Sequence, residues 1–313
     1  MRKILVTAIG GNVGNGILKI LSRGEDEIYG CDINDYPIGL DKVKKFWKSD
    51  SAVSSKYVEN LLEKCKENKI SHIIPVNEVE IAIINRNRQI FYDNEIRLLI
   101  QDNEVVNICL DKLETMNLLN EYIKENVTKT YTFENFEENN QTFIIKLRNS
   151  YGSKFLKCFK HRKEIDDLML EKDKYIIQEY LSDESEEYTI GVFSDGNIVR
   201  SIIFKRKLEH GYTSFVELIE NQKLHDLAIK VCSILNIRGS INIQLRKDND
   251  NYKIFEINPR LSGTVYFRHI LGFDDVLWWL ALLDKNNIPE YKNTYKRAIG
   301  VRELNEKFLV LQD

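Results

Sequence analysis

An alternation of acid, amide and base marks the stretch Asn251-Tyr252-Lys253-Ile254-Phe255-Glu256-Ile257-Asn258-Pro259-Arg260-Leu261-Ser262-Gly263-Thr264. Successive side chains of an extended strand point to opposite faces, so Glu256, Asn258 and Arg260 are predicted to share one face. Phe255 and Ile257, which lie between them, are predicted to face a core. Carboxylate and amide oxygens are hard ligands suited to Mg²⁺, and arginine suits a phosphate that the metal bridges. We therefore expect a metal–phosphate site on this strand.

A second strand, expected at 240–246, precedes this stretch and is joined to it by a turn at 248–251. If the two strands pair through a three-residue loop, Gln244 lies opposite Glu256 on one face. Gln244, Glu256 and Asn258 would then share one metal ion. The alternation of side chains on both strands supports this register.

Length and composition restrict the class of protein. The chain has 313 residues, which suggests about two domains, and 43 % of them are hydrophobic, which is enough to bury a sizeable core. Its formal charge of −3 indicates neither a nucleic acid nor an anionic membrane as a partner. The start, Met1-Arg2-Lys3, leads directly into a short apolar run with glycines and is not typical of a signal peptide.

The most apolar run of the chain, at 276–283, is far shorter than the roughly 20 residues that span a bilayer. We interpret it as a buried helix. Its two tryptophans, Trp278 and Trp279, are a candidate apolar contact if the protein forms a homo-oligomer, and the sequence leaves the oligomeric state open.

Cysteine and histidine usage favours a cytoplasmic protein without a zinc site. The five cysteines have no paired spacing: Cys31, Cys65, Cys109, Cys158 and Cys232. This pattern suits reduced thiols better than a disulfide framework. The five histidines are equally dispersed, which argues against a histidine-based metal centre.

The first hundred residues alternate between strands and helices. Strands are predicted at Lys3–Ala8, Glu27–Cys31, Ser71–Val76 and Ile96–Ile100, and helices from the first glycines to about Ser22, at Tyr57–Asn68 and at Ile81–Phe91. This order predicts right-handed βαβ units and a parallel sheet, hence a Rossmann-like α/β unit.

The glycine loop Ile9-Gly10-Gly11-Asn12-Val13-Gly14-Asn15-Gly16 invites comparison with a dinucleotide site, because Asp32 follows roughly 20 residues on, where a ribose-binding acid would lie. However, no G-x-G-x-x-G pattern fits these glycines. We interpret the loop as a tight strand-to-helix turn with close packing, and as a candidate lining of a substrate pocket. Asn77-Glu78 follows the third strand, where such sheets place ligands. The same pair is also typical of a helix N-cap followed by an acid in the first turn. Both interpretations of Glu78, as a ligand-binding residue and as a first-turn acid, stay open.

Lysines and acids in the second part of the chain are further candidates. Asp111 and Glu114 form a capping box that opens a helix, and Lys112 in its first turn is a candidate phosphate ligand or an ordinary solvated lysine. Lys146 ends a strand before the short polar loop 150–153. Such a loop can close over phosphates, or be an ordinary hairpin.

Further strands are predicted at Tyr175–Leu181, Tyr188–Phe193 and Ile198–Phe204, the last two joined by a hairpin turn at Asp195-Gly196, and a helix at Leu224–Leu235. Glu187 stands apart from the acidic loop before it because it abuts a strand and its side chain can face inward. The basic residues 205–207 and His210-Gly211 are interpreted as a substrate-facing loop.

Together these residues resemble the ATP-grasp superfamily, most closely its carbamoyl-phosphate-synthase-like branch. The similarity rests on Asn242-Ile243-Gln244-Leu245 followed by Phe255-Glu256-Ile257-Asn258-Pro259-Arg260-Leu261-Ser262-Gly263-Thr264, and it covers almost the whole chain. It implies an α/β and α+β protein, with a Rossmann-like pre-ATP-grasp domain at 1–105 and an ATP-grasp domain at 106–313. The latter divides into a lid-like part at about 106–180 and a C-terminal part at 181–313.

The resemblance also implies a role for each matched residue. Gln244, Glu256 and Asn258 would hold Mg²⁺, or Mn²⁺ in its place, with Arg260 beside the transferred phosphate. Lys112 and Lys146 match two phosphate-binding positions, of which Lys146 would also act in catalysis. The remaining matches are the adenine hinge Gln178, Glu179, Tyr180 and Leu181, the ribose-binding Glu187, and the looser substrate positions Arg206 and His210. The loop 150–153 departs from the family because it contains a single glycine.

The function implied by this resemblance is an ATP- and Mg²⁺-dependent ligase that activates a small carboxylate as an acylphosphate for attack by an amine. Phosphoryl transfer requires charge neutralisation and positioning, which the candidate residues supply. Two alternatives remain: a non-catalytic ATP-binding sensor or subunit, and a nucleotide-linked dehydrogenase that uses the glycine loop.

Overall fold

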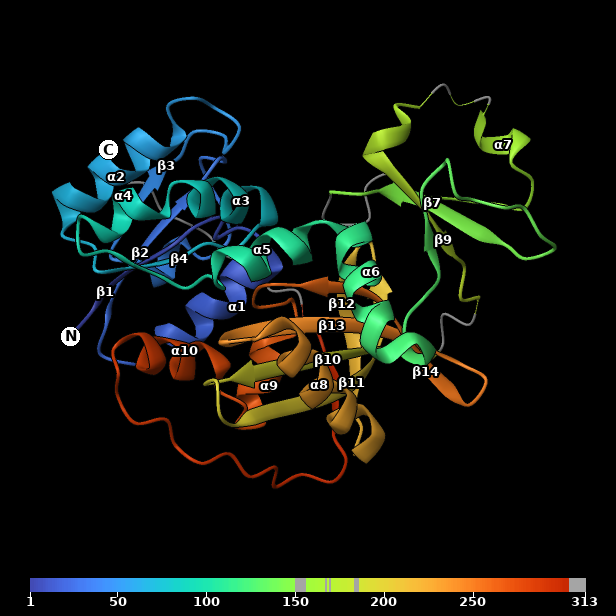
Figure 1. Ribbon diagram of the computed structural model, residues 1–313. Coiled ribbons are helices and arrows are strands. Elements are labelled where there is room, and N and C mark those ends of the chain that lie inside the picture. Colours follow the sequence, from blue (N-terminus) through green and yellow to red (C-terminus); the bar gives the residue numbers. More distant parts are fainter. Residues whose placement is uncertain (150–155, 167, 169, 183–185, 304–313) are drawn as a thin grey trace.

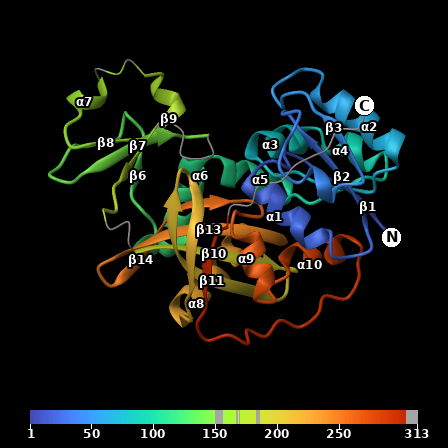
Figure 2. The same cartoon turned by 180° about the vertical axis from the view of Figure 1, so that it is seen from behind.

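The computed structural model describes residues 1–149, 156–166, 168, 170–182 and 186–303. These residues form three β-sheets, one parallel and two antiparallel. The parallel sheet and the larger antiparallel sheet lie against each other, and the smaller antiparallel sheet projects away from them (Figure 1). The view from behind shows the same projection (Figure 2).

The N-terminal unit is a five-stranded parallel sheet in the order β3-β2-β1-β4-β5. Its strands are β1 (Lys3–Val6), β2 (Glu27–Asp32), β3 (Lys45–Lys48), β4 (His72–Ile74) and β5 (Arg97–Leu98). Its helices are α1 (Asn12–Leu21), α2 (Tyr57–Asn68), α3 (Glu78–Arg86) and α4 (Arg88–Tyr92). The predicted Rossmann-like unit is therefore confirmed.

Two details of this unit differ from the prediction. Strand β3 was not expected, because its KFWK sequence offers only two apolar residues, and both remain half-buried. The helix predicted at Ile81–Phe91 is two helices. The break lies at Asn87, whose side-chain amide donates to the carbonyl of Ile83 and so satisfies the end of α3.

Two helices lead from this unit to the smaller sheet: α5 (Asn103–Leu110), which was not predicted, and α6 (Lys112–Ile123). Asp111 caps α6 by accepting bonds from the backbone of Leu113 and Glu114, as predicted. The reciprocal bond of the capping box is not formed, because the Glu114 carboxylate pairs with Arg148 instead.

The smaller sheet has the order β6-β9-β7-β8, all antiparallel. It contains β6 (Thr130–Tyr131), β7 (Phe143–Leu147), β8 (Leu156–Phe159), β9 (Tyr175–Glu179) and the short helix α7 (Lys163–Asp166). A separate aromatic core holds together this unit of β6–β9 and α7, which we call the lid, and it is built mainly from Phe133, Phe136, Phe143 and Phe159.

The larger sheet has the order β14-β13-β10-β11-β12-β15, also antiparallel. Its strands are β10 (Glu187–Ser194), β11 (Val199–Glu209), β12 (Tyr212–Leu218), β13 (Gly239–Asp248), β14 (Asn251–Asn258) and β15 (Ile299–Val301). Its helices are α8 (Gln222–Leu235), α9 (Val265–Ile270) and α10 (Asp275–Leu283). The residues expected to form a basic loop at 205–207 instead continue β11, because the strand runs on to Glu209.

The β13–β14 hairpin has the predicted cross-strand pair, Gln244 opposite Glu256, but reaches it by another route. Its loop has two residues, since Asp248 pairs with Asn251, and a bulge beside Gln244 adds the missing residue. The bulge leaves Phe255 outside the pairing. The prediction that Phe255 faces the core is wrong for this reason: its side chain is half-buried, and the Lys146 ammonium lies over its ring.

One hydrophobic core joins the parallel sheet to the larger antiparallel sheet. It includes Ile4 and Ile17 from the N-terminal unit and Phe204, Trp278 and Trp279 from the C-terminal part. The two indoles are 4 % and 2 % exposed, because they pack into this core. None of the helices in the described ranges is long and apolar enough to cross a membrane.

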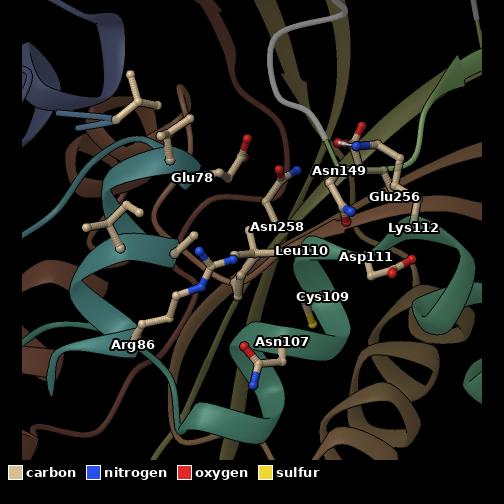
Figure 3. Close-up of a pocket in the computed structure, with 15 residues that line it drawn as sticks. Glu78, Arg86, Asn107, Cys109, Leu110, Asp111, Lys112, Asn149, Glu256 and Asn258 are labelled. Atoms are coloured by element: carbon tan, nitrogen blue, oxygen red, sulfur yellow. Dashed lines mark ion pairs between the residues drawn. The ribbon is translucent and has the colours of Figure 1, made fainter. Parts of the chain in front are cut away.

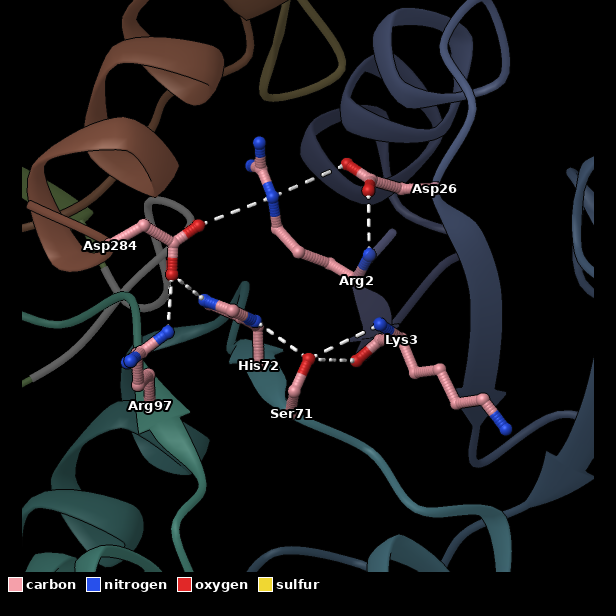
Figure 4. Close-up of polar contacts among 7 residues, drawn as sticks. All are labelled: Arg2, Lys3, Asp26, Ser71, His72, Arg97 and Asp284. Carbon is pink, nitrogen blue, oxygen red and sulfur yellow. Dashed lines mark hydrogen bonds and ion pairs between the residues drawn. The ribbon is translucent and has the colours of Figure 1, made fainter. Parts of the chain in front are cut away.

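A polar cluster reinforces the same junction (Figure 4). Asp284 follows α10. Its Oδ2 lies 3.2 Å from Arg2 Nε and its Oδ1 lies 3.0 Å from His72 Nε2, and the carboxylate also pairs with Arg97. The N-terminal unit and the larger sheet thus share both a core and an ion-pair cluster, whereas the lid has a core of its own.

Candidate active site

The predicted metal ligands meet on adjacent strands of the larger sheet. Gln244 lies opposite Glu256, and Asn242 lies opposite Asn258, along the β13–β14 ladder. Thr189 on β10 pairs with Gln244 from the other side. The hairpin therefore places the oxygens of Gln244, Glu256 and Asn258 next to one another.

Each of these three side chains has a cationic partner. The contacts are Arg206 Nη2 to Gln244 Oε1 at 2.8 Å, Lys112 Nζ to Glu256 Oε1 at 3.6 Å, and Arg260 Nη2 to Asn258 Oδ1 at 3.4 Å. The arrangement alternates negative or dipolar oxygens with positive groups. It is therefore suited to a cation and a phosphate together, because the oxygens can turn to a metal while the cations turn to the phosphate.

The donor set fits Mg²⁺ rather than zinc. It contains one carboxylate and two amides, all oxygen ligands. Among the described residues no group of three or more His, Cys, Asp or Glu side chains could hold a metal ion by itself. A site with so few protein charges suits an ion that also binds the phosphates of a nucleotide.

Arg260 connects the strand end to the N-terminal unit. Its Nε and Nη2 donate to Glu78 Oε1 at 2.9 and 2.6 Å, and its Nη1 donates to the carbonyl of Leu261. Burial raises the pKa of Glu78, while Arg260 lowers it and Glu256 raises it. Asn77 caps α3 by accepting from the backbone of Glu80, so the pair Asn77-Glu78 both starts a helix and contributes to the site.

Lys146 reaches from the lid to the larger sheet. Its Nζ donates to the carbonyl of Phe255 at 3.1 Å and lies 5.7 Å from the centre of the Phe255 ring. Burial lowers the pKa of the Lys146 ammonium to about 8, Glu256 opposes this effect, and Lys112 and Arg246 add to it. A buried ammonium with a neutral carbonyl as its hydrogen-bond partner is well placed to receive an anion.

Glu187 is held by two arginines. Its Oε1 accepts from Arg206 at 3.0 and 2.8 Å, and its Oε2 accepts from Arg246 at 3.0 and 2.8 Å. The carboxylate is 5 % exposed. A ribose hydroxyl, the predicted ligand of Glu187, would have to share this carboxylate with the arginines.

The predicted hinge lies at the end of β9. The side-chain amide of Gln178 donates to Thr130 within the lid, and Glu179 pairs with Lys253 at 3.4 Å. The guanidinium carbon of Arg246 lies 5.9 Å from the centre of the Tyr180 ring, and its Nη1 donates to the carbonyl of Leu181. Arg246 therefore connects the hinge to β13.

The start of α6 is tied to the lid. Asp111 accepts two bonds at 2.8 Å from Arg148, just after β7, and Lys112 next to it approaches Glu256. The predicted phosphate loop, at 150–153, lies outside the described residues.

Two cavities flank the predicted metal ligands. The first, of about 430 Å³, lies between α3 and α5, and we call it the α3–α5 chamber. Glu78, Lys112, Glu256 and Asn258 are among its lining residues (Figure 3). The second, of about 250 Å³, is lined by Asn12 and Val13 of the glycine loop together with Asn242 and Arg260, among others, and we call it the glycine-loop chamber.

The two looser substrate positions differ in their placement. Arg206 lines the glycine-loop chamber from within β11. His210 is exposed at the turn between β11 and β12, with a positive φ of 49°, and lines neither chamber. Its neighbours Gly211 and Tyr212 do line the glycine-loop chamber.

Arg246 and Phe255 are site residues that the sequence reasoning missed. Arg246 lies two positions after Gln244 on the same strand, so the alternation already seen on β13 was the available signal. Phe255 depends on the bulge, for which the sequence carried no signal.

The glycine loop does not offer a dinucleotide site. Asp32 is 5 % exposed, and its Oδ2 accepts the backbone N–H of Gly10 at 2.9 Å while its Oδ1 accepts from Asn34. The acid that would hold a ribose is therefore part of the loop's own structure.

Comparisons with known proteins agree with this architecture. Residues 171–307 match the family model "ATP-grasp in the biosynthetic pathway with Ter operon", and residues 4–99 match the model "PylC-like, N-terminal domain". A search of curated proteins finds no match.

Several solved structures share the fold at low sequence identity. An L-amino acid ligase from Bacillus licheniformis is 14 % identical, with a TM-score of 0.71 over 90 % of this chain and 74 % of its own. N5-carboxyaminoimidazole synthetase from Staphylococcus aureus in complex with ADP is 13 % identical, with a TM-score of 0.71 over 96 % and 80 %. A biotin carboxylase–beta-gamma-ATP complex from Campylobacter jejuni is 14 % identical, with a TM-score of 0.72 over 92 % and 72 %. At these identities the likeness shows the fold alone.

Proposed function

We propose that this chain, whose residues 171–307 match an ATP-grasp family model and whose residues 4–99 match a PylC-like N-terminal model, is an ATP-dependent ligase that joins a carboxylate to an amine. The observation that carries the proposal is the row of three oxygens, from Gln244, Glu256 and Asn258, each beside a cation. A protein that only bound a nucleotide would not need both sets of groups at the phosphate end of its cleft.

The proposed reaction has two steps. A carboxylate oxygen of the substrate attacks the γ-phosphorus of ATP, so that ADP leaves and an acylphosphate forms. The amine then attacks the acyl carbon, phosphate leaves, and the proton lost by the nitrogen goes to phosphate or solvent. A solved structure that shares this fold is a complex with ADP, which supports a nucleotide as a ligand of this chain.

Charge neutralisation is the task we assign to the residues of the site. Lys146, Lys112 and Arg260 would bind the triphosphate and stabilise the charge that develops on the transferred group. Gln244, Glu256 and Asn258 would hold Mg²⁺, which supplies charge neutralisation to the phosphates when bound. The hinge residues at the end of β9 would contact the adenine, and Glu187 the ribose.

A coupled ADP-release assay tests this proposal. Amino acids and small carboxylates are screened in pairs with amines, and Glu256→Ala and Asn258→Ala are compared with the unaltered protein. We expect both variants to fold and to lose acceptor-dependent ADP release, because the row of oxygens is broken. Glu290→Gln is the control and should keep its activity, because Glu290 forms an exposed ion pair with Lys292 and lines neither chamber.

Two outcomes would contradict the proposal. Unchanged ADP release in Glu256→Ala and Asn258→Ala would remove the assigned metal site from the reaction. Tight binding of ATP–Mg²⁺ without turnover for any pair of substrates would favour the alternative of a nucleotide sensor.

A further inference from the structure

Glu78, a residue that lines the α3–α5 chamber, has a buried acceptor atom without a donor. Glu78 is 7 % exposed, and both hydrogen bonds from Arg260 go to its Oε1. Its Oε2 is buried and has no hydrogen-bond partner among the described residues. A buried acceptor without a donor costs about 1–3 kcal/mol. The geometry therefore favours a ligand that brings an N–H or O–H group to this oxygen.

The rest of this chamber suits a small organic body. Its lining combines polar and apolar side chains, and the apolar part includes Val79, Ala82 and Ile83 from α3, Leu110 from α5, and Pro259. A volume of about 430 Å³ is within the range of small-molecule sites. At its inner end lie Glu256 and Asn258, so a ligand here borders the proposed phosphate-transfer centre.

The charged groups of the chamber are already paired near that inner end. Lys112 lies 3.6 Å from Glu256, and Asp111 is bound by Arg148. Arg86 lies at the other end of α3 and is exposed to solvent. Among the described residues that line this chamber, the Glu78 oxygen is thus the buried acceptor without a donor, while the side-chain nitrogen of Asn258 is a buried donor without an acceptor.

The glycine-loop chamber has the opposite character. Arg206 and Arg260 line it, and the side-chain nitrogen of Asn242, a residue 1 % exposed, is a buried donor without a partner among the described residues. The two chambers share Glu256 and Asn258, and the Glu78–Arg260 ion pair stands between them, since Glu78 lines one and Arg260 the other.

We propose that the amine substrate occupies the α3–α5 chamber, where it donates an N–H to Glu78 Oε2 and packs its apolar body against α3 and α5. The carboxylate substrate would occupy the glycine-loop chamber, so the two substrates approach the transfer centre from opposite sides of the Glu78–Arg260 pair. This inference rests on the proposed ligase function, because only that function requires two substrates.

Protection of an introduced thiol tests the inference without turnover. A82C places a thiol in the α3–α5 chamber and V13C places one in the glycine-loop chamber, each in a full-length C158S background that removes the exposed native thiol. Alkylation by iodoacetamide is followed by mass spectrometry of the labelled peptide. The probes are n-butylammonium chloride, sodium butyrate and tetramethylammonium chloride at matched ionic strength, the last being a cation without an N–H donor.

We expect n-butylammonium to slow alkylation of A82C several-fold and to leave V13C unaffected. Tetramethylammonium and butyrate should not protect A82C. Adding E78Q to A82C should raise the half-protecting concentration of butylammonium about tenfold or more, because the substituted amide gives its oxygen to Arg260 and turns its NH₂ group toward the ligand. Circular dichroism verifies that each variant is folded.

Equal protection of A82C and V13C, protection of A82C by tetramethylammonium, or the absence of protection by butylammonium would overturn the inference. The comparison of A82C with V13C keeps the native Glu78 and therefore stands even if E78Q does not fold. Because labelling requires no reaction, a negative ADP-release screen would contradict the ligase proposal and leave this result unchanged.

Discussion

At the scale of single residues, the site is built from charges that are kept out of water. Lys146 is 6 % exposed, Glu78 is 7 % exposed and Glu187 is 5 % exposed, and each is positioned by neighbouring polar groups. Burying an ionised group costs stability unless it is fully paired. The Lys146 ammonium donates to the neutral carbonyl of Phe255, and burial lowers its pKa to about 8. We therefore expect Lys146 to lower the free energy of unfolding, and its buried ammonium to serve instead in binding the phosphates of ATP.

Lys146→Met tests this cost. The ammonium has a pKa near 10.5 in the unfolded chain and about 8 in the folded protein, so folding is disfavoured most fully below pH 8, where the folded state must bury the charge. We expect the variant to be more stable by about 2–3 kcal/mol at pH 7, with the gain shrinking as the pH rises from 8 toward 10.5. Urea denaturation at pH 7 and pH 10 measures both.

The same variant should lose its affinity for ATP, measured by calorimetry, because the cation that would meet the phosphates is gone. Lys64→Met is the control, since Lys64 is an exposed lysine paired with Glu67 and should change neither property. If Lys146→Met were less stable than the unaltered protein at pH 7, the prediction would be wrong, and the neighbouring polar groups would fully compensate the burial of the ammonium.

At the scale of elements, the β13–β14 hairpin sets the geometry of the site. Its two-residue loop and the bulge at Phe255 together bring Gln244 opposite Glu256. The start of β13 is fixed by contact with α10, because Gly239 has a φ of 116° and packs directly against the Trp279 indole. A side chain at this position would be strained in backbone conformation and would also overlap the ring.

Gly239→Ala is therefore expected to destabilise the protein by more than about 2 kcal/mol, measured by thermal or urea denaturation. Gly196→Ala separates the two causes. Gly196 also has a positive φ, of 98°, but a Cβ there would meet open space. Its substitution should cost only about 1 kcal/mol. If the two variants lost the same stability, contact with Trp279 would not be what positions β13.

At the scale of the whole molecule, the N-terminal unit and the larger sheet act as one body that carries both chambers. The shared core and the Asp284 cluster hold them together (Figure 4). His72 is 1 % exposed, with its Nε2 beside Asp284 and its Nδ1 beside Ser71. Burial lowers its pKa from 6.5, and Asp284 opposes the shift. The stability that His72 contributes is therefore present above pH 6.5 and is lost as the pH falls below it.

Asp284→Asn should weaken this junction by about 2 kcal/mol, because three donors lose the charge that they share. Differential scanning calorimetry at pH 7.5 gives the change, and a separate early transition would show that the two parts have uncoupled. Glu290→Gln is the matched control, since its ion pair with Lys292 is exposed on both sides and should contribute almost nothing. A melting curve identical to that of the unaltered protein would remove Asp284 from the junction.

What the sequence determined by itself was local and periodic. The alternation of strands and helices predicted the parallel sheet, and Asp111 predicted the start of α6. The alternation of Glu256 and Asn258 with apolar residues predicted a strand with a polar face. These features depend on neighbours within a few residues, and such contacts can be read from spacing.

Only the tertiary structure decided which side chains meet. The bulge that turns Phe255 into the cleft, the Glu78–Arg260 pair across 182 positions of the chain, and the two arginines on Glu187 have no local pattern. Each depends on how strands and domains pack. A buried charge needs a partner, and the residue that becomes its partner is the one that packing brings close in space. The sequence pointed to a phosphate site, and packing built the two chambers on either side of it.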